Sequence, residues 1–230
     1  YRESYGTGET PTLTTLREAL LKQPEDIARE IALSLELYTV GSLDIFGHES
    51  NVDLTKRVIV FDTHRLGPSL KSPGMLIITD TILNRVAQSH RNGIRTHVFI
   101  DEFHTAFSND SSAKFLDSVW RQFRKRDAYP TGITQNVDFL WNFPLARSML
   151  GNSEFIVMLS QAEQDRERLS KLFNISSTQL AYVTDAEPGS GLIKYGSTLV
   201  PFVNHFPKDT ELYELMTTKP GEGVFGQAKN

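Results

Sequence analysis

With 230 residues, the chain can bury the core of one large α/β domain or two small ones, and its 39% hydrophobic and 23% charged residues are typical of a soluble globular protein. Its formal net charge of -4 argues against a dedicated duplex-binding domain covered in basic residues, and the absence of cysteine excludes disulfides and thiolate metal sites. No apolar run approaches the roughly 20 residues that cross a bilayer, so we expect any membrane contact to go through partners.

Two helices are predicted first. The threonines between Thr12 and Thr15 offer N-caps for a short amphipathic helix. Pro24 suits the first turn of a second helix. Apolar residues that recur every three or four positions predict one buried stripe on this second helix: Ile27, Ile31, Leu35 and Tyr38. The segment from Gly41 to Asp53 is predicted to be a loop or hairpin.

Two strand-like runs occupy the middle of the chain. Residues 57–62 (RVIVFD) and 96–101 (THVFID) are β-branched or aromatic runs that end in a carboxylate, which suits strands buried on both faces. Between them, residues 75–88 carry apolar side chains at helical spacing. This order of strand, helix and strand predicts a parallel βαβ unit.

The second half continues this alternation. A helix that starts near Asp110 is predicted to turn five apolar side chains to the core: Phe115, Leu116, Val119, Trp120 and Phe123. Two more strands are predicted at 131–134 and 154–159. The remaining predicted elements are helices at 136–150, 163–173 and 177–182, and a hairpin of 191–195 with 198–203 around Gly196-Ser197.

The predicted fold class is α/β, with a mainly parallel sheet flanked by helices, a C-terminal hairpin and helical additions near the N-terminus. The strands that end at Asp62, Asp101, Thr134 and Leu159 are expected to be neighbours with their carboxyl ends at one edge. We expect three segments: a helical segment and loop at 1–56, the core at 57–207, and a helix with a polar tail at 208–230.

An apolar strand that delivers two adjacent carboxylates, Asp101 and Glu102, is the sharpest chemical signal. In open parallel sheets, ligands collect at the carboxyl edge of the strands. In nucleotide hydrolases the first such carboxylate holds Mg²⁺, usually through water, and the second polarises the attacking water. Asp101 is therefore the candidate metal-side residue and Glu102 the candidate base. The structural alternative is that the pair only begins a loop or caps the next helix.

Thr134 and Gln135 end the next predicted strand, so they are expected beside Asp101 at the same edge. A glutamine side chain can bond both water and a phosphate oxygen there, and Thr134 is the candidate nucleotide-binding hydroxyl. The alternative for Gln135 is an ordinary turn residue. His104, just past Glu102, is interpreted as a packing or capping residue.

Basic residues gather where the helix after Asp110 ends. Arg121, Arg124 and Lys125 have helical spacing, and in a ring-shaped motor such an arginine can reach a neighbour's nucleotide. Arg124 is the candidate arginine finger. For Arg121 and Arg126 we favour the structural alternative, which is charge at a helix C-terminus and pairing of Arg121 with Asp117.

A phosphate-binding loop requires a strand, a glycine loop and then Lys-Ser or Lys-Thr. The nearest match, Tyr5-Gly-Thr-Gly-Glu-Thr10, has Glu9 in place of lysine and Pro11 directly after it, and is interpreted as a turn. Because the chain begins with Tyr1 rather than Met, we expect it to lie within a longer protein that carries the loop upstream.

The chain resembles the conjugative-transfer ATPases of type IV secretion, the VirB-four, TraE and TraC group of RecA-like motors. The resemblance rests on the order of many short motifs: Pro11-Thr-Leu-Thr, Gly41-Ser-Leu-Asp-Ile-Phe, Asn51-Val-Asp, Val60-Phe-Asp62, Ile100-Asp-Glu-Phe103, Arg124-Lys-Arg126, Gly132-Ile-Thr-Gln-Asn136, Gly151-Asn-Ser, Leu159-Ser-Gln161 and Gly191-Leu-Ile. It implies the C-terminal part of a RecA-like motor domain. One departure is Phe103-His104, where an aromatic tryptophan often follows the acidic pair.

The resemblance implies that the full-length parent hydrolyses ATP with Mg²⁺ and uses the energy for pilus assembly or substrate transfer. It also implies a ring, expected to be a hexamer, that lies at the cytoplasmic side of the inner membrane with other secretion components. Single-stranded DNA is a further expected partner. Two alternatives stay open: a DNA-gripping translocase module of the FtsK and HerA class, and a catalytically idle assembly platform.

Overall fold

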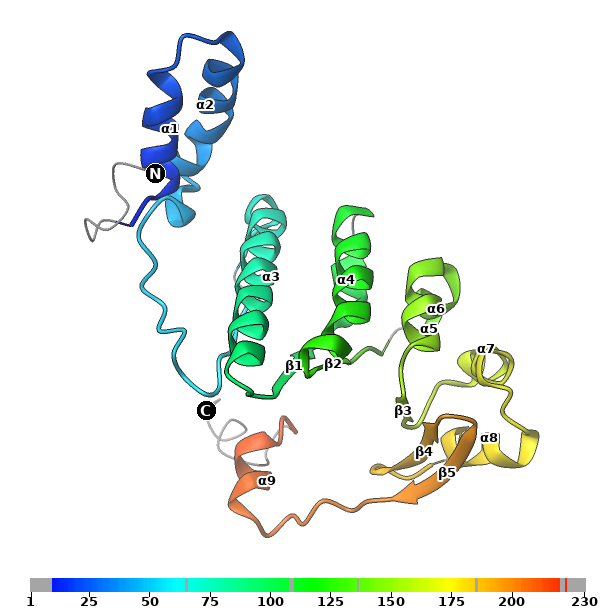
Figure 1. The fold of residues 1–230 in the computed structure, drawn as a ribbon. Helices are drawn as coiled ribbons and strands as arrows, with labels where there is room; N and C mark the ends of the chain where they lie inside the picture. Colours follow the sequence, from blue (N-terminus) through cyan, green and yellow to red (C-terminus); the bar gives the residue numbers. More distant parts are fainter. Residues whose placement is uncertain are drawn as a thin grey trace. The chain divides into compact units, whose positions relative to one another are not determined.

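The computed structural model describes residues 10–64, 66–107, 110–135, 137–184, 186–219 and 222, and Figure 1 traces their elements along the chain. The chain divides into two compact units, Tyr1–Thr81 and Ile82–Asn230, which are described separately. The segment boundaries expected from the sequence, at 56/57 and 207/208, stay a prediction.

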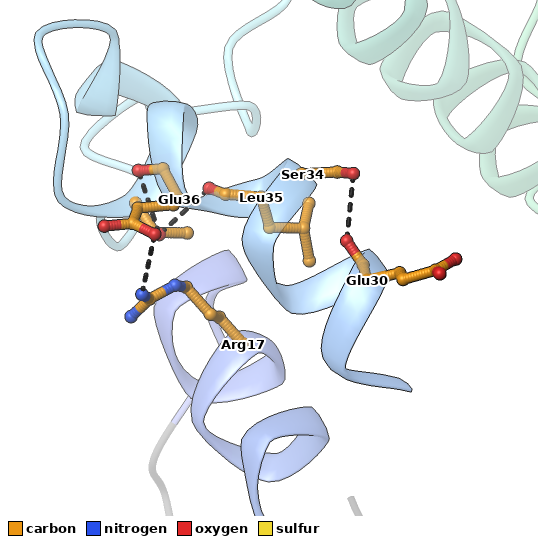
Figure 2. Close-up of polar contacts among 6 residues, drawn as sticks. Arg17, Glu30, Ser34, Leu35 and Glu36 are labelled. Atoms are coloured by element: carbon orange, nitrogen blue, oxygen red, sulfur yellow. Dashed lines mark hydrogen bonds and ion pairs between the residues drawn. The ribbon is translucent and has the colours of Figure 1, made fainter. Parts of the chain in front are cut away.

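The first unit opens with a pair of helices, α1 (Leu13–Leu21) and α2 (Asp26–Thr39), followed by the short 3₁₀ helix η1 (Asp44–Phe46). Thr12 caps α1 as the sequence predicts: its side chain accepts from the Thr15 amide, and the Thr15 hydroxyl in turn lies 2.8 Å from the Thr12 amide. Figure 2 shows Arg17 of α1 reaching Glu36 of α2, with 3.4 Å between guanidinium and carboxylate. The cap thus starts α1, and the ion pair joins α1 to α2.

The buried stripe of α2 differs from the predicted one. Of the predicted stripe, Ile27 and Ile31 are exposed and Leu35 and Tyr38 are half-buried. The buried residues of α2 are Ala28, Ala32 and Thr39. Both sets recur at helical spacing, so periodicity alone does not choose between them. The small side chains allow α2 to approach its neighbour closely, and the isoleucines then lie outside the contact. Pro24 also lies outside the helix, because Glu25 occupies the N-cap position.

Loss of the cap at Thr12 gives a first test of this unit. We expect Thr12→Ala to destabilise α1 by about 1 kcal/mol, because the amide of Thr15 loses its side-chain acceptor at the helix N-terminus. Amide hydrogen exchange should rise in the first turn of α1 and stay unchanged in α2. Equal protection of α1 in the variant and the parent would show that the cap contributes nothing.

The predicted strand at 57–62 is wrong. These residues form no strand, and Val58 and Val60 are exposed. Their β-branched side chains favour an extended backbone, but a strand also needs a partner for its hydrogen bonds, and sheet pairing in the described chain begins only at Thr96. The carboxylate of Asp62 instead accepts the backbone N–H of His64 at 2.9 Å.

Helix α3 (Pro68–Arg91) is longer than the predicted 75–88 and includes Pro73. Pro68 suits the first helical position, where a missing N–H costs nothing. Gly74 is buried, and a Cβ there would lie 2.8 Å from the Leu66 side chain. Close packing of Leu66 therefore accounts for a glycine inside a helix.

The second unit contains the parallel pair β1 (Thr96–Ile100) and β2 (Ala128–Gly132), connected through the 3₁₀ helix η2 (Phe103–Phe107), helix α4 (Asp110–Phe123) and the 3₁₀ helix η3 (Arg124–Arg126). Val98 of β1 packs on one core cluster and Ile100 on another, while Phe99 is exposed. The strand predicted at 131–134 starts three residues earlier and ends two residues earlier, and its parallel pairing with β1 is confirmed.

Pro130 removes one hydrogen-bond donor from the outer side of β2. The Ile133 amide donates to Ile100, so by alternation the amide position of Pro130 faces away from β1. A proline on that side offers no N–H to a further strand. In the described chain β2 pairs with β1 alone, and the expected neighbour belongs to another sheet.

That second sheet is antiparallel. Strand β3 (Phe155–Met158) pairs with β4 (Ser190–Tyr195), and β4 pairs with β5 (Thr198–Val203), which confirms the predicted hairpin and corrects the expectation of a parallel β3. The remaining helices are α5 (Val137–Asn142), α6 (Pro144–Gly151), α7 (Glu163–Phe173), α8 (Ser177–Thr184) and α9 (Glu211–Met216). The predicted helix 136–150 is thus two helices, because it breaks at Phe143-Pro144.

The α/β class is therefore confirmed, with a parallel strand pair, flanking helices, a C-terminal hairpin and N-terminal helices. Of the four strands expected in one parallel sheet, two share it. In the part of the chain that the structure describes, every helix is too short or too polar to span a bilayer.

Candidate functional site

The site begins where β1 and β2 end. Backbone pairing continues one step past both strands: the Ile133 amide donates to the Ile100 carbonyl at 2.9 Å, and the Phe103 amide donates to the Ile133 carbonyl at 2.8 Å. These two bonds tie the chain after β1 to the chain after β2. Residues from two sequence positions about 30 apart are thereby fixed at one edge of the sheet.

The backbone turns sharply at Glu102. Its φ of 46° lies in the left-handed region, which side chains other than glycine seldom adopt. The Asp101 carboxylate accepts the Glu102 amide at 2.9 Å, and the Glu102 carbonyl accepts the Thr105 amide at 2.8 Å. The acidic pair therefore does begin a 3₁₀ turn, as the structural alternative holds. Unusual backbone conformations of this kind gather at functional sites, where surrounding contacts maintain them.

Four side chains meet at this edge. Glu102 Oε1 accepts from Gln135 Nε2 at 3.4 Å, and Glu102 Oε2 lies 3.2 Å from His104 Nδ1. The same His104 nitrogen lies 3.2 Å from Thr134 Oγ1. The Glu102 side chain is 48% exposed and that of His104 is 29% exposed. A carboxylate that faces solvent is thus held from both sides by polar groups, and these groups come from both strands.

An aromatic cluster lies beneath the site. Phe103, between the two polar residues, is buried with Phe107 and Phe139, and its ring centroid lies 5.2 Å from that of Phe107. Gly132 leaves room for this ring because it has no side chain: a Cβ on Gly132 would lie 2.9 Å from Phe103 Cγ. Glu102 and His104 therefore bond at the surface while Phe103 anchors their turn in the core.

Adding a methyl group at Gly132 tests this anchor. We expect Gly132→Ala to destabilise the unit by about 1–3 kcal/mol, the usual effect of overpacking, because a ring held among buried neighbours has little room to shift. Thermal melting would measure the loss. An unchanged melting temperature would mean that Phe103 moves freely, and the turn at Glu102 would then lack the proposed anchor.

The structure places the other predicted site residues as follows. Asp101 is exposed at the same edge, beside Glu102. Arg124 is exposed in η3, which directly precedes the N-terminal end of β2, so it lies at the opposite edge from Glu102 of the same chain. The α-helix ends at Phe123, so Arg121, Arg124 and Lys125 do not share one α-helical face. Arg121 pairs with Asp117 at 2.9 Å, which confirms the structural alternative for Arg121.

His104 is the residue that sequence reasoning undervalued. Its contacts with Glu102 and Thr134 join residues up to 30 positions apart, so local sequence gives no direct sign of them. One signal was present: if two parallel strands end side by side, polar residues two to four positions beyond each end can meet. His104 and Thr134 both satisfy this condition.

Two further sequence features can be placed. The glycine-bearing turn from Tyr5 lies, except for Thr10, outside the described residues. Across the described residues, no three or more His, Cys, Asp or Glu side chains gather as a metal-binding group.

A family model, the TraG P-loop domain, matches residues 16–186. The match covers the ends of β1 and β2, with Asp101 and Glu102, and most of the helical segment before them. The chain belongs to the TraG P-loop domain family. This membership confirms the resemblance to conjugative-transfer ATPases that the ordered motifs indicate, and it assigns the chain to the P-loop NTPases.

The fold of this TraG P-loop chain is similar to a solved structure, VirB4 of Thermoanaerobacter pseudethanolicus, with a TM-score of 0.71 and 20% sequence identity. The similarity covers 88% of this chain and 58% of that one, so the chain spans a little over half the length of its structural relative. It confirms the RecA-like α/β fold. No curated protein sequence matches the chain.

Proposed function

We propose that the chain carries the hydrolytic edge of an ATPase motor, in which Glu102 activates the attacking water. The observation that carries this proposal is the position of the Glu102 carboxylate: it is exposed at the carboxyl end of a parallel pair, where ligands of such sheets bind, and it is held by Gln135 and His104. A general base must be both accessible and positioned, and Glu102 is both.

The residues at this edge suit a magnesium nucleotide. Mg²⁺ is bound in proteins through one or two carboxylates together with substrate phosphates, and it keeps several waters. Asp101 supplies an exposed carboxylate and Thr134 a hydroxyl at the edge where phosphates would lie. Asp101 would hold the metal side and Thr134 the phosphate side. When bound, the metal would neutralise the charge of the phosphates and of the two carboxylates.

Gln135 and Arg124 have separate proposed roles. The Gln135 amide contacts Glu102 and has a carbonyl oxygen that can accept from water, so it can orient the water that Glu102 activates. Arg124 lies away from its own chain's Glu102. We assign it to the nucleotide of a neighbouring subunit, since an exposed arginine at the opposite edge can act only in trans.

We propose that the motor acts in conjugation or type IV secretion as a hexameric ring. It would be peripheral to the cytoplasmic membrane, held there through other secretion components. Family membership supports this assignment. The formal net charge of -4 argues against a domain covered in basic residues for duplex DNA, and a local basic channel completed by neighbouring subunits stays the alternative for a DNA-gripping module.

The test is ATP hydrolysis by the intact parent protein. Phosphate release that requires Mg²⁺ and stops with EDTA would support the proposal. Nucleotide binding without release of phosphate would instead favour an assembly platform. A matched measurement with single-stranded DNA would show whether DNA stimulates turnover, as a translocase requires.

The 230-residue chain by itself is expected to bind ATP weakly. ATP affinity in P-loop motors comes largely from the loop amides and its lysine, and the sequence contains no Gly-Lys-Ser or Gly-Lys-Thr. A ligand at 100 times its dissociation constant would stabilise the fold by about 2.7 kcal/mol. We expect no such thermal shift with Mg-ATP. A saturable shift would reveal a phosphate site in the chain itself.

A further inference from the structure

His104 stands between the two strand ends. Its Nδ1 atom lies 3.2 Å from Glu102 Oε2 and 3.2 Å from Thr134 Oγ1, so both oxygens are within hydrogen-bond distance of the same nitrogen. An imidazole nitrogen offers either one hydrogen or one lone pair. Because an ionised carboxylate can only accept, the contact with Glu102 requires the hydrogen to be on Nδ1. The Thr134 hydroxyl must then accept the same hydrogen.

The two oxygens therefore compete for one donor. The carboxylate is the stronger acceptor, because charge-assisted hydrogen bonds are roughly twice as strong as neutral ones. The Thr134 oxygen weakens the hydrogen bond from His104 to Glu102 as long as it accepts the same hydrogen. A ligand that draws the Thr134 hydroxyl away would leave the hydrogen to Glu102 alone.

We propose that His104 is a positioning residue, which holds the Glu102 carboxylate through a hydrogen bond from Nδ1–H and shares that hydrogen with Thr134. A ligand that contacts Thr134 at the end of β2 would then strengthen the hydrogen bond from His104 to Glu102. This role rests on the proposed function of Glu102. The ring is suited to it, because His104 is two-thirds or more buried and lies against Phe139, with ring centroids 6.3 Å apart. The left-handed turn at Glu102 brings the carboxylate within its reach.

Three substitutions of His104 in the intact parent protein distinguish the role of Nδ1 from that of Nε2. The amide nitrogen of asparagine can take the place of Nδ1, that of glutamine reaches the place of Nε2, and phenylalanine keeps the packing without a donor. We expect His104→Phe and His104→Gln to lower kcat roughly 10- to 100-fold, since small displacements of a catalytic group have effects of that size. KM for ATP should stay within about twofold, and His104→Asn should keep most of kcat.

Equal kcat in His104→Asn and His104→Gln would overturn the role of Nδ1. A kcat of His104→Phe equal to that of the unsubstituted protein would overturn it as well. If Glu102→Gln loses turnover while His104→Phe keeps it, only the positioning role fails. If Glu102→Gln keeps turnover, the proposed function itself fails.

A second measurement needs no turnover. With ¹⁵N-labelled histidine in the intact protein, the ring resonances that vanish in His104→Asn belong to His104. We expect its Nδ1 to be protonated, and its resonance to shift in Thr134→Val, which removes the competing oxygen. An unprotonated Nδ1, or no shift in Thr134→Val, would overturn the shared hydrogen bond.

Discussion

Replacing Glu102 with glutamine in the intact parent protein is expected to abolish most ATP turnover while leaving ATP binding intact. Glutamine has nearly the same shape and keeps a carbonyl oxygen within reach of Gln135, but it cannot take a proton from water. Removal of a positioned base lowers the rate by about 10² to 10⁴. Steady-state phosphate release and binding of a fluorescent ATP analogue measure the two quantities separately.

Glu187→Gln is the matched control. Glu187 is exposed in the loop before β4, where its backbone carbonyl accepts the Ser190 amide at 3.0 Å. Its replacement by glutamine removes the same charge away from the site. Turnover should stay at the parent level. If Glu102→Gln also turned over at that level, Glu102 would be left with its structural role at the start of η2.

The largest stability effect is expected at Gly191 in β4. Gly191 is buried, and a Cβ there would run into the backbone carbonyl of Met158 in β3. A backbone atom in a paired strand cannot turn aside as a side chain can. We expect Gly191→Ala to destabilise the second unit by about 3 kcal/mol or more, in the upper range for one substitution. That loss corresponds to a fall in melting temperature of roughly 6–12 °C or more.

Gly151→Ala is the control for this variant. Gly151 ends α6, and nothing lies within 4 Å of the position of an added Cβ. Alanine is the better helix former, so stability should be unchanged or slightly higher. Circular dichroism melting would compare the two. Equal melting of Gly191→Ala and the parent would show that β3 and β4 can separate enough to admit a methyl group.

Elements with complete local signals were predictable from the sequence. The cap at Thr12, the run at 96–101 and the turn at Gly196, which has a φ of 57°, each contain the residues that their structure requires. The run at 57–62 has an equally strong local signal, yet it forms no strand. Strand formation depends on a partner, and the local sequence does not carry that information.

The candidate site was predictable in part for the same reason. Parallel pairing of β1 with β2 is enough to place Glu102 near Gln135, and the sequence supports that pairing. The left-handed turn at Glu102 and the double contact of His104 depend on the exact register and on the ring of Phe103 beneath. Packing of this kind is decided by the whole unit, so no single motif predicts it.

The aromatic cluster under the site also gives the protein an optical signal. The Trp120 ring lies 5.4 Å from that of Phe103, whose neighbours in the chain are Glu102 and His104. Indole emission responds to its surroundings, so a rearrangement of the turn at Glu102 would change the fluorescence of Trp120. With Trp141, the other tryptophan of the sequence, replaced by phenylalanine, nucleotide-driven motion at the edge could be followed in real time without an attached dye.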